Sequence, residues 1–115
     1  MDEKEARALL DAFGQAWNDH DLEAALALTT DDVVFESTSP SPDGQRSVGR
    51  DAVREAWKPI FADSVSRFDV EELVIAGDRA LQRWTYRWDG GHVRGVDVFA
   101  LRDGKVAEKL SYVKG

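Results

Sequence analysis

The chain has 115 residues, a formal net charge of −7 at pH 7 and no cysteine. Its length fits one domain. Because an acidic protein is repelled by a phosphate backbone, we expect no nucleic-acid partner. The lack of cysteine excludes disulfides and thiolate metal sites. A charged N-terminus and the absence of an apolar run of about 20 residues predict a cytoplasmic protein that does not enter a membrane.

The start of the chain predicts two helices. Apolar residues recur at spacings of three and four between Glu3 and Trp17, which is the pattern of a helix with one buried face. The segment Asn18–Asp21 interrupts this pattern. Asp21 is a suitable N-cap, so a second, short helix is predicted directly after it.

The middle of the chain predicts a strand, a loop and a third helix. The β-branched and aromatic residues of Val33–Ser37 indicate a strand. Two prolines, several serines and a glycine between Ser37 and Gly49 indicate a loop. The third helix is predicted from Gly49 to about Asp63, and we expect Pro59 to kink it or to end its regular part.

The second half of the chain predicts four strands. Turn signals rich in glycine and aspartate separate the segments Phe68–Ala76, Leu81–Trp88, Val93–Leu101 and Val106–Val113. Short turns of this kind join neighbouring antiparallel strands, so the four segments should form a meander.

The order of these elements and four of the segments resemble a known superfamily. The segments are Trp17–Leu22, Leu28–Phe35, Gly49–Val53 and the Gly95–Phe99 stretch followed by Asp103–Val106. The chain is similar to the SnoaL-like members of the superfamily that includes nuclear transport factor 2, the ketosteroid isomerases, the polyketide cyclases and the limonene epoxide hydrolases. The resemblance implies a single α+β domain over residues 1–115 with the cone-shaped NTF2-like fold, in which three N-terminal helices pack on a strongly curved, mainly antiparallel sheet. This scaffold hosts enzymes, ligand binders and docking proteins, so it indicates the fold more sharply than the function.

Asp97 is the strongest candidate for a functional residue. It shares one face of its strand with Val93, Gly95, Phe99 and Leu101, so a carboxyl group lies among apolar neighbours. Burial favours the neutral acid, which can donate a hydrogen bond to a developing oxyanion or act as a general acid or base. The resemblance to the polyketide cyclases implies the same role. The alternative is a structural aspartate bound to backbone amides or to a basic side chain.

The partners of Asp97 in related enzymes are not matched. By position in the shared elements, Phe13 and Ser37 stand where the ketosteroid isomerases carry a tyrosine and a base. The epoxide hydrolases need an Asp–Arg–Asp cluster. Asp97 and an arginine such as Arg83 would supply two of its members, but no second acid has an evident inward register. The polyketide cyclases are therefore the nearer enzymatic match.

Lys109 is the second candidate catalytic residue. It lies in register with Ser111 on the last strand, on the face opposite Tyr112. If the Lys109 face turns into the cone, an ion pair with Asp97 would keep that carboxylate charged. If the other face turns inward, Tyr112 enters the pocket. Alternation alone leaves both arrangements open.

Aromatic residues predict the wall of a ligand pocket. Trp84, Tyr86 and Trp88 share one face of their strand, where they form either core or a binding surface for a flat hydrophobic molecule. The complete predicted pocket consists of Phe13, Trp17, Phe35, Ser37, Trp57, Trp84, Tyr86, Trp88, Phe99 and Tyr112.

Two functions remain open from the sequence. One is a cofactor-free cyclase or isomerase that uses Asp97 as its acid or base; the other is a non-catalytic binding or docking module. No cofactor and no metal are expected, because no ligand spacing or phosphate-binding loop is present. The apolar outer face of Val96, Val98 and Ala100 predicts a homodimer.

Overall fold

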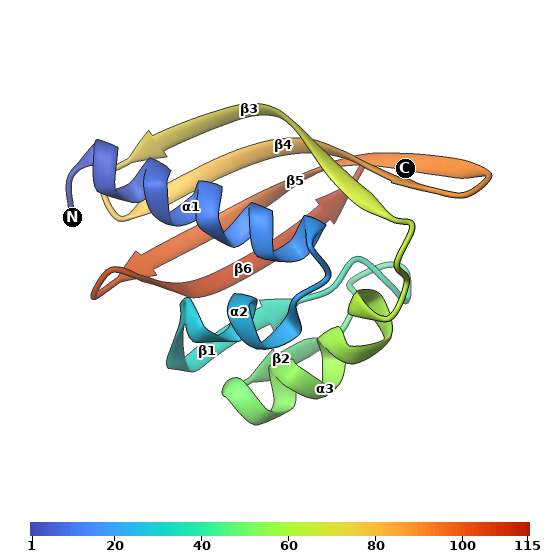
Figure 1. The fold of residues 1–115 in the computed structure, drawn as a ribbon, viewed down its shortest axis with the longest axis horizontal. Helices are drawn as coiled ribbons and strands as arrows, with labels where there is room; N and C mark the ends of the chain where they lie inside the picture. The colour runs from blue at the N-terminus through green and yellow to red at the C-terminus, as the bar shows by residue number, and fades with distance from the viewer.

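The computed structural model describes residues 1–115 and places three helices against the concave face of one six-stranded sheet (Figure 1). The helices are α1 (Glu3–Asn18), α2 (Leu22–Ala27) and α3 (Arg50–Phe61). The strands are β1 (Thr29–Glu36), β2 (Arg46–Val48), β3 (Arg67–Ala76), β4 (Arg79–Trp88), β5 (Gly91–Arg102) and β6 (Lys105–Val113). None of the helices combines the length and the hydropathy that a membrane crossing requires.

Local sequence signals explain where the helices begin. The Asp2 side chain caps α1 by accepting a hydrogen bond from the Glu5 backbone amide. The Glu5 carboxylate accepts one from the Asp2 backbone amide, which completes a capping box. Asp21 caps α2, as the sequence predicts. The third helix runs through Pro59 to Phe61, so the proline lies inside its last turn and does not end it.

The strand order across the sheet is β2-β1-β6-β5-β4-β3. The predicted meander is confirmed, because β3, β4, β5 and β6 pair antiparallel with their neighbours in turn. The first strand joins this sheet by pairing parallel to β6. The prediction of a continuous loop from Ser37 to Gly49 is wrong for β2, which pairs antiparallel with β1 and places Val48 opposite Val34. A strand of three residues between turn-forming residues carries too little alternation to be detected in the sequence.

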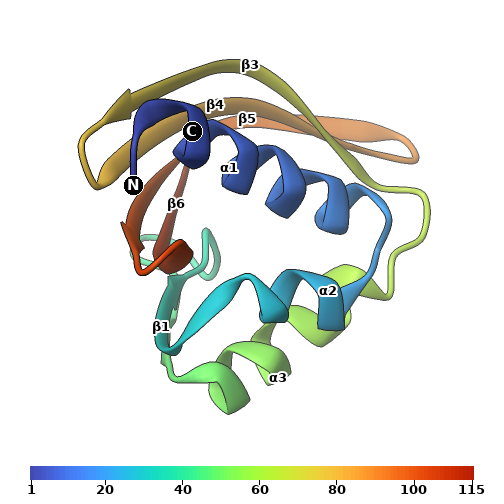
Figure 2. The same cartoon turned by 60° about the vertical axis from the view of Figure 1, so that its left-hand side comes forward.

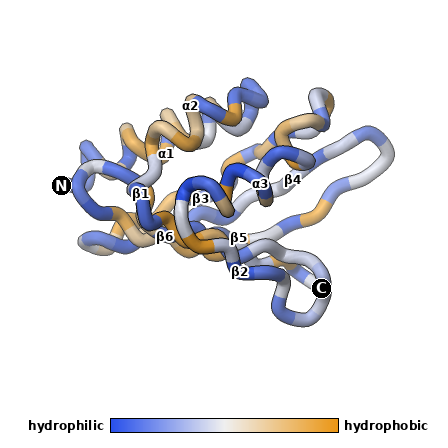
Figure 3. The backbone as a smooth tube through the Cα atoms, turned by 90° about the horizontal axis from the view of Figure 1, so that it is seen from below, coloured by the Kyte–Doolittle hydropathy of each residue, from blue (hydrophilic) through white to orange (hydrophobic).

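The sheet curves around α1, and α2 and α3 cover the space below it (Figure 2). Hydrophobic and hydrophilic residues alternate along α1, as expected of a helix that buries one face (Figure 3). Phe13 and Trp17 of that face pack edge-on against Trp57 of α3, with ring centroids 5.9 and 5.0 Å away. These aromatic rings form the centre of the core. The dimer predicted through the outer face of the sheet remains a prediction.

A bulge in β3 organises the convex face of the sheet. The register between β3 and β4 shifts between Val70 and Glu72, which adds Glu71 to the strand. The Glu71 carboxylate accepts hydrogen bonds from Arg94 at 2.9 Å and from the Thr85 hydroxyl at 2.6 Å. Arg94 first, and Thr85 second, lower the pKa of Glu71 from 4.5 to about 2.

This network predicts acid sensitivity. Because the pKa of Glu71 is lower in the folded protein than in the unfolded chain, its stabilising effect is complete above about pH 4.5 and is lost as the pH falls towards about 2. We expect Glu71→Gln to lower the urea midpoint near neutral pH, and the difference from the wild-type protein to shrink steadily on acidification. Urea unfolding at a series of pH values measures this, and a difference that is independent of pH would contradict it.

Candidate functional site

Asp97 and Lys109 form a buried ion pair on the concave face. The pairing of β5 with β6 places Asp97 opposite Ser111 and Phe99 opposite Lys109. Lys109 Nζ lies 3.2 Å from Asp97 Oδ2, and the two side chains are 6% and 4% exposed. The Ser111 hydroxyl donates to Asp97 Oδ1 at 2.7 Å and accepts from Lys109 Nζ at 3.0 Å. Both carboxylate oxygens of Asp97 therefore face a donor group.

Aromatic rings surround the ammonium group of Lys109. Its Nζ lies 4.7 Å from the centroid of the Trp17 ring and 5.2 Å from that of Phe35. Both distances are those of cation–π contacts. Lys109 thus lies on the inward face of β6, whereas Tyr112 is 54% exposed on the opposite face.

Two cavities meet at this lysine. The first, which we call the cone cavity, has a volume of about 360 Å³ and lies between the sheet, α3 and the segment after β1. Its apolar wall includes Phe35, Ile60, Trp84 and Tyr86. Its polar groups are those of Ser37, Thr38, Ser39, Asp63, Lys109 and Ser111.

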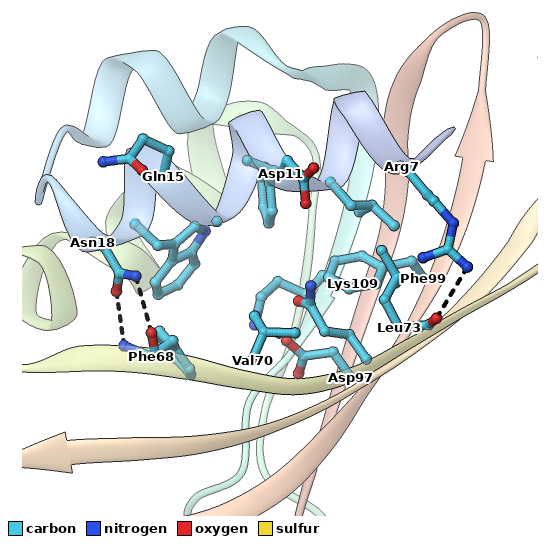
Figure 4. A pocket seen from close by; sticks show the side chains of 15 residues that line it. Arg7, Asp11, Gln15, Asn18, Phe68, Val70, Leu73, Asp97, Phe99 and Lys109 are labelled. Carbon is cyan, nitrogen blue, oxygen red and sulfur yellow. Dashed lines mark hydrogen bonds and ion pairs between the residues drawn. The ribbon is translucent and has the colours of Figure 1, made fainter. Parts of the chain in front are cut away.

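The second cavity, which we call the α1–β3 cavity, has a volume of about 400 Å³ and opens between α1 and the edge of the sheet (Figure 4). Asp97, Gln82 and Phe99 line it from the sheet, and Phe13 lines it from α1. The residues that line both cavities are Trp17, Phe68 and Lys109. Asp97 lines only the α1–β3 cavity, because Lys109 and Ser111 lie between it and the cone cavity.

The structure divides the predicted pocket residues among these places. Trp17, Phe35, Ser37, Trp84 and Tyr86 line the cone cavity. Phe13, Trp17 and Phe99 line the α1–β3 cavity.

Three predicted pocket residues line neither cavity, and their assignment is corrected. Trp57 is fully buried, because rings from α1, β1 and α3 enclose it in the core. Trp88 lies at the end of β4 and is 40% exposed. Tyr112 points away from the cone, because Lys109 and Ser111 occupy the inward face of β6.

Ser37 and Asp63 are two of the polar residues that line the cone cavity. The Ser37 hydroxyl donates to the Ser39 carbonyl at 2.8 Å and accepts from the Gln45 backbone at 2.9 Å, so it holds the loop together. Asp63, the carboxylate that lines the cone cavity, is exposed. No group of three or more histidine or acidic side chains is placed to hold a metal ion.

Sequence reasoning did not select Gln82, Phe68 or Ser111 as site residues. Two of them could have been found from strand alternation. Ser111 lies two residues after Lys109 and Gln82 lies two residues before Trp84, so each shares a strand face with a predicted site residue. Phe68 carries no such signal, because the contact of its ring with Trp17 at 5.6 Å depends on how α1 packs against β3.

Comparisons with known proteins support the resemblance. The sequence model of the SnoaL-like domain matches residues 10–109. An NTF2-like protein of unknown function from Mesorhizobium loti is 39% identical, with a TM-score of 0.87 over 97% of this chain and 93% of that one. A computationally designed binder of 17-OHP is 26% identical, with a TM-score of 0.81 over 96% of this chain and 91% of that one. A protein from Sinorhizobium meliloti with the provisional name polyketide cyclase is 24% identical, with a TM-score of 0.76 over 90% and 93% of the two chains. No curated protein matches the chain.

Proposed function

Because this chain belongs to the SnoaL-like domain family, we propose that its cone cavity binds a small, planar hydrophobic molecule whose carbonyl or hydroxyl oxygen faces Lys109. The observation that carries this proposal is the buried ammonium group of Lys109 at an aromatic-lined cavity. The designed binder of 17-OHP has the same fold, which supports the use of the cone for a small molecule.

The shape of the cone cavity favours a flat ligand. Trp84 and Tyr86 alternate along β4 and turn their rings to the same side as Phe35. Gly95 lies opposite Trp84 on β5, and a Cβ atom there would come within 2.7 Å of the tryptophan ring. The glycine therefore allows the ring to lie close to the sheet. A volume of about 360 Å³ lies within the range of small-molecule sites.

The polar end of the cone cavity favours an oxygen atom. A lysine ammonium group has three N–H donors, and two of them are directed to Asp97 and Ser111. The third has only aromatic faces beside it, so a ligand oxygen would give it a stronger acceptor.

The charge of the site favours a neutral oxygen over a carboxylate. Asp97 already balances the charge of Lys109, and both groups are buried. A ligand carboxylate would add an unbalanced negative charge in a region of low dielectric constant. A ketone, a phenol or another neutral oxygen avoids that cost.

The contacts of Asp97 favour a binding function over one in which Asp97 acts as an acid–base catalyst. Both oxygens of this carboxylate are occupied by Ser111 and Lys109, and these two residues separate it from the cone cavity. A proton transfer through Asp97 would first have to break one of these contacts. The cyclase or isomerase alternative thus requires a rearrangement that ligand binding does not.

Two probes of the same shape test this proposal. We expect 2-acetylnaphthalene to quench tryptophan fluorescence in a saturable manner and to bind more tightly than 2-naphthoate. In Asp97→Asn the charge of Lys109 is unbalanced, so the order of the two affinities should reverse. Ile60→Trp fills the cone cavity and should abolish binding of both probes, whereas Trp88→Leu, outside the cavity, should leave it unchanged. The proposal fails if neither probe binds, or if Ile60→Trp binds them as the wild-type protein does.

A further inference from the structure

The α1–β3 cavity is held open by contacts at both of its ends. Asn18 at the end of α1 donates to the Phe68 carbonyl at 2.9 Å and accepts from the Phe68 amide at 2.7 Å. One turn into the start of the helix, Arg7 donates to the Leu73 carbonyl at 3.3 Å. Between these contacts Val70 points from β3 towards the helix and is nonetheless 52% exposed (Figure 4). The helix is therefore anchored to β3 without filling the space between them.

A glycine contributes to this space. Gly14 lies inside α1 and lines the cavity. A Cβ atom built on it would meet no other atom within 4 Å, so close packing does not require a glycine here. Glycine inside a helix lowers helix stability relative to alanine. The chain therefore keeps a destabilising residue whose structural effect is to leave room.

Gln82 provides an unpaired polar group in the same cavity. The residue is 8% exposed and lies opposite Asp97 in the pairing of β4 with β5. No hydrogen bond joins its amide to another group of the protein, although it lines the cavity. The amide atoms are not among the buried polar atoms that lack a partner, so they are open to the cavity. A bound molecule with a matching donor and acceptor can therefore form hydrogen bonds with them.

The charges around the cavity cancel. Asp97 and Lys109 are paired with each other at its inner end. At its outer edge Arg7 forms an ion pair with Glu3, and the other charged residue, Asp11, is exposed to solvent. No unbalanced buried charge is available to attract an ion, so a neutral occupant fits best.

From these observations we infer that the α1–β3 cavity is a second small-molecule site, distinct from the cone cavity. It binds a neutral molecule with a carboxamide-like head group, which exchanges two hydrogen bonds with the Gln82 amide. The apolar body of the molecule packs against Phe99, Leu73 and Val70. This inference does not depend on the function proposed for the cone cavity.

Benzamide is a suitable probe, since it joins a neutral carboxamide to a flat apolar ring. In NMR titrations of the isotope-labelled protein, we expect benzamide to shift the Gln82 side-chain amide and the Gly14 backbone amide in a saturable manner. Gln82→Leu should weaken binding by about tenfold or more, because it removes both hydrogen bonds.

Variants that fill one cavity at a time separate the two sites. Gly14→Leu should abolish benzamide binding and leave the binding of 2-acetylnaphthalene intact, whereas Ile60→Trp should have the reverse effect. Gly14→Ala adds a single methyl group and should weaken benzamide binding while raising the urea midpoint. The inference is overturned if benzamide shifts neither Gln82 nor Gly14, or if Gln82→Leu binds it as tightly as the wild-type protein.

Discussion

Replacing Lys109 with methionine is expected to lower the free energy of unfolding by about 3–5 kcal/mol, since removal of one partner from a buried ion pair leaves the other charge uncompensated. Asp97 is 3% exposed and would keep only the Ser111 hydroxyl as a donor. Urea unfolding of the variant and of the wild-type protein at neutral pH measures the difference.

The double variant Lys109→Met with Asp97→Leu distinguishes the loss of a partner from the loss of packing. It removes both charges, and we expect it to recover most of the stability lost in the single variant. Lys105→Met is the matched control, because Lys105 begins the same strand and is exposed. If the double variant is as unstable as the sum of its two single variants, the two charges are not coupled and the interpretation is wrong.

Replacing Trp57 with alanine is expected to lower the free energy of unfolding by about 3–5 kcal/mol, the usual cost of removing a large buried aromatic side chain. The ring is fully buried, and its centroid lies within 6.0 Å of the centroids of Phe13, Trp17, Phe35 and Phe61. Because neither cavity adjoins Trp57, the substitution leaves a new void among these rings.

Trp88→Ala is the control for this substitution. Trp88 is 40% exposed at the end of β4, so we expect a change of about 1 kcal/mol or less. Urea unfolding measures both variants. Equal effects of the two substitutions would contradict the assignment of Trp57 to the core and of Trp88 to the surface.

Both cavities border one neutral polar cluster. Lys109, Asp97 and Ser111 form an ion pair and two hydrogen bonds with one another beside aromatic rings. Both cavities are lined by Lys109. A buried pair of this kind contributes little net stability, because desolvation offsets its attraction. Its effect is to place a fixed donor beside the cone cavity while adding no net charge to it.

The sequence by itself determined the order of the helices and of the long strands. The spacing of apolar residues in α1 and the turns of the meander are local signals, and local signals can be recognised without knowing what packs against them. For the same reason alternation placed Asp97 on the same face as Phe99 before any neighbour was known. β2 was missed because three residues carry no such pattern.

Only the tertiary structure decided which side of β6 turns inward. Both faces of that strand carry apolar residues, so the choice between Lys109 and Tyr112 depends on how β6 pairs with β5, where the register shifts between Ala100 and Leu101. The two cavities are equally non-local. The α1–β3 cavity requires that Asn18 and Arg7 anchor the helix to β3, 50 and 66 residues away in the chain. A residue pattern along one strand or helix does not report the distance between that element and its neighbours. This distance determines whether an aromatic residue lies in the core, as Trp57 does, or lines a cavity, as Trp84 does.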